Sequence, residues 1–359
     1  MKARHNRWKA HVNKPLKALA FMLLFTIKAL GQVSNYDDKP ISMAKLEQTI
    51  THAMDSLGVP GMSVAIINKG KVVYCKGFGF ADTSKEKKVT ATTFFEAASL
   101  SKPVFSYYVL TLAKEGKIDL TKPLYKYLLE PDIVDDRYKK ITAEMVLSHT
   151  TGLPNWRETP KMELAFDPGQ GFAYSGEAYM YLAKVVANLK NTTLWRLDEN
   201  FQQEIAHPLK LKDFHFVITP KVGAKLAVAY QDGEPVEDTR DRSMFDPAGG
   251  LYANAPNFAK FLIALMNQKE SYSEMFKPFI QLPADDPLSS LFGISAWTLG
   301  LAEIKIGQST NFWHGGNNLG YTSSFMIDPT KQFGYVFFTN ADQCNGMKKV
   351  FETILWNRD

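Results

Sequence analysis

The stretch Ser99-Leu100-Ser101-Lys102 opens an apolar segment with helical spacing in this 359-residue chain. It is the starting point for predicting both the fold and the chemistry. Two other stretches belong with it: Tyr174-Ser175-Gly176, which opens a second helical segment, and His314-Gly315-Gly316, just before a strand-like run. A serine hydroxyl becomes a nucleophile only with a base within hydrogen-bond reach and donors for the developing oxyanion. If Ser99 lies in the first turn of a helix, position i+3 shares its face, which makes Lys102 a candidate base. The three stretches together predict an acyl-transfer site.

The pattern Ser-x-x-Lys is a weak signal by itself, because it occurs at 42–45, 84–87 and 99–102. The first copy begins a helix with a polar face, and the second lies in a charged loop. Only the third follows an apolar run with small residues and precedes a helix of buried type. The structural alternative for Ser99 is a helix N-cap, which is the commoner use of serine at such a position.

Hydrophobic spacing predicts a mixed chain, with α and β segments at both ends and a mostly helical part between about 103 and 245. Helices are expected at 42–57, 99–115, 142–148, 176–189, 193–205, 256–266 and 346–356. Strands are expected at 62–68, 71–79, 292–299, 322–328 and 334–339. This order favours an α+β fold in which an open antiparallel sheet is built from about 42–98 and 250–359, with the terminal helices packed on it.

The formal charge of +5 comes from the N-terminal segment, where residues 1–31 carry seven Lys or Arg and no acidic residue. Without them, 35 basic residues face 37 acidic ones, so nothing in the charge points to nucleic acid or an anionic membrane as partner. The basic start and the apolar run from Ala18 to Ile27 are typical of a signal peptide. The run is too short to span a bilayer, and an uncleaved anchor is the alternative. We therefore expect an exported protein, periplasmic or extracellular, with no membrane contact beyond this segment.

Two cysteines, Cys75 and Cys344, are expected to be separate thiols, because they would pair only if the two ends of the chain meet. No His-Glu-x-x-His occurs, so neither zinc nor any other metal or cofactor is implied. No Gly-x-Ser-x-Gly elbow occurs either, which disfavours an α/β-hydrolase triad.

Four segments in order carry a family resemblance: 97–102 (Ala-Ala-Ser-Leu-Ser-Lys), 147–154 (Leu-Ser-His-Thr-Thr-Gly-Leu-Pro), 172–176 (Phe-Ala-Tyr-Ser-Gly) and 247–251 (Pro-Ala-Gly-Gly-Leu). Together they resemble the serine β-lactamase-related family, which takes in class C β-lactamases, D-alanyl-D-alanine carboxypeptidases, D-amino-acid peptidases and class C-like esterases. The likeness runs from about residue 42 to the C-terminus. It implies a β-lactamase/transpeptidase-like domain at 42–359.

By this resemblance Ser99 is the acylated nucleophile, Lys102 its first proton partner and Tyr174 the second. The family's oxyanion hole maps to the backbone N–H groups of Ser99 and Asn317. Gly315 and Gly316 would let their strand approach the substrate closely. Tyrosine and lysine have ordinary pKa values of about 10 and 10.4, so either acts as a base near neutral pH only if its surroundings shift it.

Two departures from the family pattern bear on the substrate. Gly176 stands where the family commonly has asparagine, so the amide that contacts a substrate amide is missing. His314 stands where β-lactamases have lysine, and a mostly neutral histidine would hold a substrate carboxylate less strongly. These departures favour an ester, or a D-amino-acid or small peptide amide, over β-lactams. The alternative is a non-catalytic binding or scaffold protein that keeps the fold, and Gly176 is the feature that raises it.

Other residues allow two interpretations. His149, in the Ser-His-Thr-Thr-Gly turn, is expected to be structural. Trp156, Trp313 and Tyr321 would either line the pocket or belong to the core.

Overall fold

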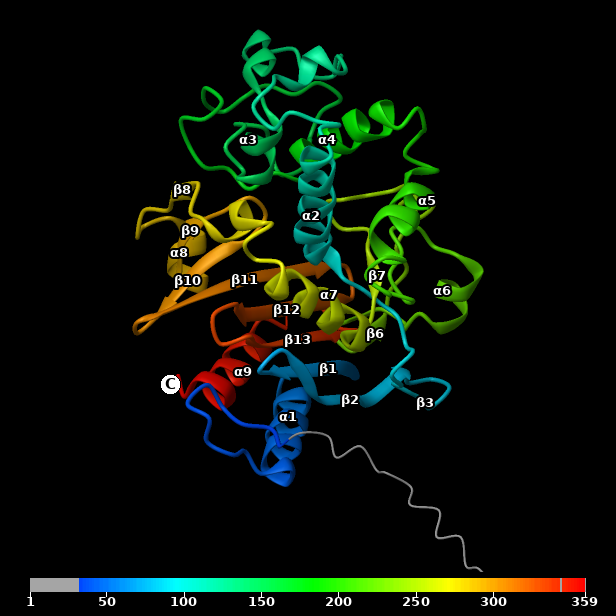
Figure 1. Ribbon diagram of the computed structural model, residues 1–359. Helices are drawn as coiled ribbons and strands as arrows, with labels where there is room; N and C mark the ends of the chain where they lie inside the picture. The colour runs from blue at the N-terminus through cyan, green and yellow to red at the C-terminus, as the bar shows by residue number, and fades with distance from the viewer. Residues whose placement is uncertain (1–31, 343, 359) are drawn as a thin grey trace, which may run out of the picture. The chain divides into compact units, whose positions relative to one another are not determined.

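The computed structural model describes residues 32–342 and 344–358, and within them the chain has the expected α+β fold. Nine strands of the described chain form one antiparallel sheet in the order β3-β2-β1-β13-β12-β11-β10-β9-β8 (Figure 1). These strands are β1 (Gly61–Asn68), β2 (Lys71–Asp82), β3 (Lys87–Lys88), β8 (Ile280–Gln281), β9 (Ile294–Trp297), β10 (Ala302–Ile306), β11 (Ser309–Asn318), β12 (Tyr321–Asp328) and β13 (Phe333–Thr339). Two small ladders pair β4 (Phe95–Glu96) with β7 (Tyr252–Ala253) and β5 (Tyr230–Gln231) with β6 (Glu234–Pro235).

Both ends of the chain build the centre of the sheet, as the element order predicts. Strand β1 pairs with β2 on one side and with β13 on the other, so Met62 lies opposite both Phe78 and Thr339. Every residue of β1 is buried, which requires cover on both faces of the sheet.

The helices supply that cover. They are α1 (Met43–Ser56), α2 (Ser101–Lys114), α3 (Ala143–Leu147), α4 (Gly176–Leu189), α5 (Leu197–Phe201), α6 (Pro220–Lys225), α7 (Ala255–Asn267), α8 (Pro287–Phe292) and α9 (Gly346–Trp356). Short 3₁₀ turns lie at η1 (Ala98–Leu100), η2 (Leu124–Lys126), η3 (Asp136–Lys140) and η5 (Ser273–Phe276), and a π turn, η4 (Gln202–Ala206), follows α5.

Alternate residues of the strands face two separate hydrophobic cores. Val64 and Ile66 of β1 pack in the core that contains α1 and α9, whereas Ala65 and Ile67 pack in the core that contains α2 and α7. Figure 1 shows α1 and α9 on one side of the sheet and α2 and α7 on the other. The predicted packing of the terminal helices on the sheet is confirmed.

The structure differs from the sequence prediction at 302–318. The sequence pattern places His314-Gly315-Gly316 ahead of a strand, but these residues lie inside β11, and β10 was not predicted at all. Glycine and asparagine disfavour strands in isolation. Strand β11 forms nevertheless because it is paired along both edges, with β10 and with β12.

The predicted targeting segment, residues 1–31, lies outside the described residues. Within the described ranges, no helix is both long enough and apolar enough to cross a membrane. Cys75 lies on β2 and Cys344 lies just before α9, and both are free thiols.

Candidate active site

Ser99 lies in a strained turn between β4 and α2. The turn is η1, and its first residue, Ala98, has a φ of 48°, in the left-handed region that side chains disfavour. The Ser99 side chain caps neither η1 nor α2, so the N-cap alternative does not hold. Ser99 is partly exposed and lines a pocket. Strain of this kind persists only where surrounding contacts enforce it, and it is common at functional sites.

Three buried hydrogen bonds hold the turn in place. The Ser101 hydroxyl donates to the Ala98 carbonyl at 2.6 Å and accepts from the Leu251 N–H at 2.9 Å. The Ser323 hydroxyl, on β12, donates to the Ala97 carbonyl at 2.6 Å. The backbone around Ser99 is therefore fixed by the sheet and by the 247–251 segment.

Lys102 lies one helical turn after Ser99, and its amine is fully buried. Its Nζ is 3.2 Å from Ser99 Oγ and 2.7 Å from the Ala248 carbonyl oxygen. Burial lowers the pKa of Lys102 to about 7, while the negative charge of Asp246 acts in the opposite direction. The amine can therefore be neutral near pH 7 and accept a proton from Ser99.

Tyr174 completes this group from the start of α4. Ser175 caps that helix by accepting from the Ala178 N–H at 3.0 Å, which fixes the preceding tyrosine. The ring centroid of Tyr174 is 4.7 Å from Nζ of Lys102. Burial raises the pKa of Tyr174 far above its usual value, although a hydrogen bond with Ser99 opposes the shift. The phenol therefore keeps its proton at neutral pH and can donate it.

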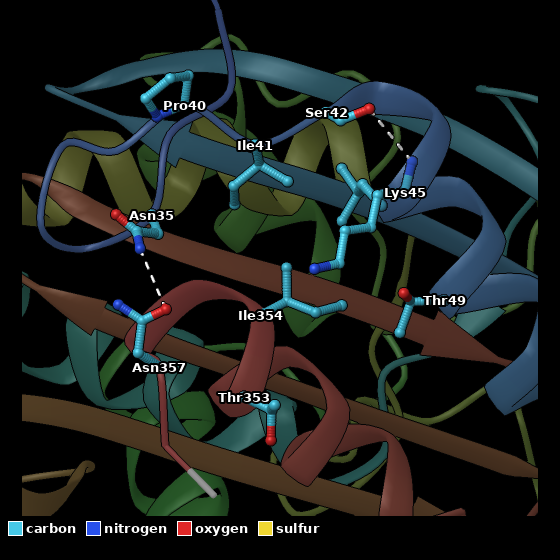
Figure 2. Close-up of a pocket in the computed structure, with 10 residues that line it drawn as sticks. Asn35, Pro40, Ile41, Ser42, Lys45, Thr49, Thr353, Ile354 and Asn357 are labelled. Atoms are coloured by element: carbon cyan, nitrogen blue, oxygen red, sulfur yellow. Dashed lines mark hydrogen bonds between the residues drawn. The ribbon is translucent and has the colours of Figure 1, made fainter.

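The first Ser-x-x-Lys copy serves a different purpose. The Ser42 hydroxyl accepts from the backbone N–H of Lys45 at 3.5 Å and so caps α1. Figure 2 shows the Lys45 side chain extending away from Ser42, with Ile41 and Ile354 nearby. These residues line a hollow of about 440 Å³ between α1 and α9. Identical spacing thus gives a helix cap at 42–45 and a buried Ser–Lys contact at 99–102, because only the second lysine lies inside a core.

Strand β11 passes close beside Ser99. A Cβ atom on Gly316 would lie 2.8 Å from the Ser99 nitrogen and 2.7 Å from the Ala97 oxygen, so only glycine fits there. Asn317, the next residue, lines the same pocket as Ser99. This arrangement brings the predicted oxyanion residues, Ser99 and Asn317, to one pocket.

His314 lies behind the pocket, and its side chain is not among those that line it. Its Nδ1 is 2.8 Å from the Gly315 carbonyl oxygen, and its ring packs 6.2 Å from Tyr174 and 5.6 Å from Trp297. Burial, together with the positive charge of Lys102, lowers the pKa of His314 to about 3. A neutral, buried imidazole offers no cation for a substrate carboxylate.

His149 is also buried and supports Tyr174. Its Nδ1 accepts the Ser175 N–H at 3.0 Å, and its ring lies 4.2 Å from the ring of Tyr174. Burial and the charge of Lys102 hold the pKa of His149 well below its usual range. Its contacts are those of a structural histidine.

Lack of space for a side chain explains why residue 176 is glycine in this chain. A Cβ atom there would lie 2.9 Å from both the Asn155 carbonyl oxygen and the indole of Trp156. The Gly176 N–H donates to Oδ1 of Asn155 at 3.0 Å. The 155–156 loop therefore occupies the space that a larger residue at 176 would need.

The pocket at Ser99 has a volume of about 240 Å³ and a largely apolar wall. The apolar wall consists of Leu288, Phe292, Ile294, Trp297 and Trp313. Sequence reasoning missed all of these residues except Trp313, and it also missed Asn345, which lines the same pocket. Of the aromatic candidates, Trp313 lines the pocket. Tyr321 is buried, with its hydroxyl donating to the Ala227 carbonyl at 2.5 Å, and Trp156 is half exposed beside Gly176. Among residues 32–342 and 344–358, no cluster of side chains suited to a metal ion is found.

Residues 46–350 match the family model described as Beta-lactamase, and the chain therefore belongs to this family of serine β-lactamase/transpeptidase-like proteins. The family includes carboxypeptidase and esterase members.

Curated relatives are distant. "Protein flp" of Staphylococcus aureus (strain MW2) is 23% identical over 330 residues, which are 84% of this chain and 64% of that protein. The chain thus spans less than two thirds of that relative's length. Esterase EstB of Burkholderia gladioli is 25% identical over 223 residues, covering 54% of this chain and 55% of the esterase.

Two solved structures share the fold. The octameric penicillin-binding protein homologue from Pyrococcus abyssi superposes with a TM-score of 0.74 at 21% identity, covering 89% of this chain and 78% of that one. The β-lactamase/D-alanine carboxypeptidase from Yersinia pestis, complexed with citrate, superposes with a TM-score of 0.71 at 18% identity, covering 87% of this chain and 99% of that one.

Proposed function

We propose that this chain is an exported serine hydrolase that works through an acyl-enzyme on Ser99. Its substrate is an ester, or a D-amino-acid or small peptide amide, rather than primarily a β-lactam. The observation that carries the proposal is the buried Lys102 amine, 3.2 Å from Ser99 Oγ, with a pKa lowered to about 7. A base whose pKa lies near the working pH combines the right protonation state with useful basicity.

In the first step the neutral Lys102 amine takes the hydroxyl proton as Oγ of Ser99 bonds to the substrate carbonyl carbon. The oxyanion that forms is held by the backbone N–H groups of Ser99 and Asn317. Tyr174 then gives its proton to the leaving oxygen or nitrogen as the bond to the carbonyl carbon breaks, and it is reprotonated from Lys102. In the second step water attacks the ester carbonyl on Ser99 and Lys102 takes a proton from it. Lys102 then gives this proton to Oγ of Ser99 as the bond between Oγ and the acyl carbon breaks, which releases the acid and restores the serine hydroxyl.

The preference against β-lactams rests on the charge of the site. His314 occupies the position where β-lactamases have lysine, and it is buried and neutral. Among the described residues, no Lys or Arg lines the pocket at Ser99. A substrate carboxylate would therefore lose water without gaining an ion pair, which is costly.

The test is the intact mass of the purified protein after exposure to a fluorophosphonate, with Ser99→Ala as control and a penicillin in parallel. A single fluorophosphonate adduct on the wild type alone supports an activated Ser99. A stable penicillin adduct would shift the substrate toward cell-wall peptides. No adduct from either reagent on folded protein would contradict the proposal and favour the non-catalytic binding role that Gly176 raises.

Export rests on the composition of residues 1–31 alone. N-terminal sequencing of the protein recovered outside the cytoplasm checks it. A chain found only in the cytoplasm would contradict export, whereas an exported chain that still begins at Met1 would favour the uncleaved anchor over a signal peptide.

A further inference from the structure

The pocket at Ser99 combines catalytic polar groups at one end with an apolar wall at the other. The wall consists of Leu288, Phe292, Ile294, Trp297 and Trp313. The remaining lining residues are small or polar and, within the described part of the chain, none carries a formal charge: Ser99, Tyr174, Gly315, Gly316, Asn317 and Asn345.

Helix α8 supplies the outer part of the wall. Asp286 caps it by accepting from the N–H groups of Leu288 and Ser289 at 2.8 and 3.4 Å, and Gly293 ends it at a φ of 73°. Leu288 and Phe292 are four residues apart, so they share one face of this single-turn helix, and that face lines the pocket. Leu291, on another face, is 73% exposed.

Aromatic contacts join residues of the wall to one another and to Tyr174. Phe292 stacks on Trp313 with ring centroids 5.0 Å apart, and Trp297 packs edge-on against Tyr174 at 5.7 Å. Trp313 is further fixed by the bond from its indole N–H to Ser324 Oγ at 2.8 Å. These rings cannot turn away without breaking the packing around Tyr174 and β11.

Lys348 lies behind the wall, where its Nζ donates to the Phe292 carbonyl oxygen at 3.3 Å. Its Nζ lies 5.3 Å from the ring centroid of Trp313 and is paired at 2.5 Å with Glu352, which is also buried. Lys348 is not among the residues that line the pocket at Ser99.

We infer that the substrate is an uncharged ester with an apolar acyl group, and that Leu288 and Phe292 set the preferred length of that group. This inference rests on the proposed hydrolase function and narrows it. The acyl group stays bonded to Oγ of Ser99 through both chemical steps, so a pocket that opens directly from this atom is suited to hold it. A carboxylate at the apolar end of this pocket would meet aromatic and aliphatic carbon, because no Lys or Arg of the described chain is among the lining residues.

The energetics give a measurable expectation. Each methylene moved from water into an apolar pocket should raise kcat/KM about three- to fourfold. A volume of about 240 Å³ lies below the range of pockets for drug-sized ligands, so the rise should stop at a short to medium chain.

The experiment measures kcat/KM of the full chain for p-nitrophenyl acetate, butyrate, hexanoate and octanoate, and for the hemisuccinate, all below their micelle concentrations. Rates with Ser99→Ala are subtracted. The expected result is a steady rise from acetate to butyrate or hexanoate, a plateau beyond, and a hemisuccinate rate at least tenfold below that of butyrate. Phe292→Ala and Leu288→Ala should each reduce the hexanoate-to-acetate ratio about tenfold or more. The matched control, Leu291→Ala, changes the same helix outside the pocket and should leave the ratio unchanged.

The failures of the two proposals are distinguishable. Turnover that depends on Ser99 but is flat across the chain lengths, prefers the hemisuccinate, or responds equally to Leu291→Ala and Phe292→Ala would overturn this inference and leave the hydrolase standing. No Ser99-dependent turnover of any ester, together with no fluorophosphonate adduct, would overturn the hydrolase function itself.

Discussion

Lys102 is the residue whose charge the proposed chemistry depends on, and burial sets that charge. Because the neutral amine is the active form and its pKa is about 7, the rate of Ser99 acylation should rise about tenfold per pH unit below pH 7 and level off above it. His314, with a pKa of about 3, and His149, with a pKa well below 6.5, are already neutral there, so neither accounts for a rise near pH 7. Fluorophosphonate labelling rates from pH 5 to 9 measure the profile.

A matched variant separates this role from a structural one. Lys102→Met keeps an unbranched chain in the same space and removes a buried amine, so it should fold while labelling falls by about 10²- to 10⁴-fold. A profile that is flat from pH 5 to 9, or a Lys102→Met protein that labels at the wild-type rate, would remove Lys102 from the mechanism.

Gly316 is the residue that lets β11 approach Ser99. Gly316→Ala should place a methyl group 2.8 Å from the Ser99 nitrogen, displace one of the two oxyanion donors, and lower kcat by about 10²- to 10³-fold. The control is Gly223→Ala on α6, where the nearest atom to a new Cβ is 4.0 Å away. Steady-state kinetics measure kcat of both variants, and thermal melting shows that each is folded. Near-normal kcat in Gly316→Ala would contradict the proposed oxyanion geometry.

At this scale the sequence predicts the groups that bear chemistry but not their environment. Spacing brings Ser99 and Lys102 together, since three residues along a helix is a fixed geometry. The left-handed φ of Ala98 and the lowered pKa of Lys102 depend on contacts with distant segments, and no local pattern records them. Leu288 and Phe292 carry no signature either, because apolar residues look alike whether they face a core or a pocket.

Among the secondary-structure elements, the short strand β4 connects η1, the turn that contains Ser99, to the rest of the site. Its Glu96 is buried, pairs with Arg240 at 2.6 Å and Arg242 at 2.9 Å, and accepts from Asn318 Nδ2 of β11 at 2.6 Å. One carboxylate thus joins three segments: β4, the 240–242 loop and the end of β11.

Removing that carboxylate should leave Arg240 and Arg242 with Asp238 as their remaining buried partner. Glu96→Ala should lower the free energy of unfolding by about 2–4 kcal/mol, slightly below the usual cost for a fully buried pair because Arg240 is about half exposed. Glu199→Ala, which removes an exposed pair with Arg196, should leave the free energy of unfolding nearly unchanged. Urea denaturation of the two variants is the measurement. Equal losses would contradict a connecting role for Glu96.

Elements with strong periodicity were predictable, and paired but glycine-rich ones were not. The helix predicted at 42–57 is α1, and the strand predicted at 334–339 is β13, because each buries a continuous apolar face. Strand β11 was not predictable because its Trp-His-Gly-Gly-Asn run has no alternation of apolar and polar residues. It is a strand because it pairs with its two neighbours, β10 and β12.

In the whole molecule, the last helix stabilises the sheet built from both chain ends. Phe351 of α9 stacks on Tyr335 and Phe337 of β13, with centroids 4.9 and 5.3 Å apart. Phe351→Ala should therefore lower the free energy of unfolding by about 3–5 kcal/mol, with Lys349→Ala, exposed on the same helix, as a nearly silent control. Denaturation followed by circular dichroism checks this. A loss confined to α9, with the sheet transition unmoved, would show that the helix is not part of the same cooperative unit.

The overall architecture was predictable in outline, because mixed segments at both ends around a helical middle leave few ways to bury every apolar face. The order of nine strands was not predictable, since β-pairing over long distances depends on side chains that meet only in the folded chain.

The pairing of β1 with β13 also determines how late in translation the centre of the sheet can form. A ribosome delivers β1 early and β13 near the end, so the centre of the sheet stays open for most of translation. Contacts between such distant segments form slowly, and the waiting strands are exposed edges on which other chains can add. Such a nascent chain would need a holding chaperone or prompt delivery to a translocase. A premature stop codon before Phe333 would remove β13, so its product would lack the centre of the sheet.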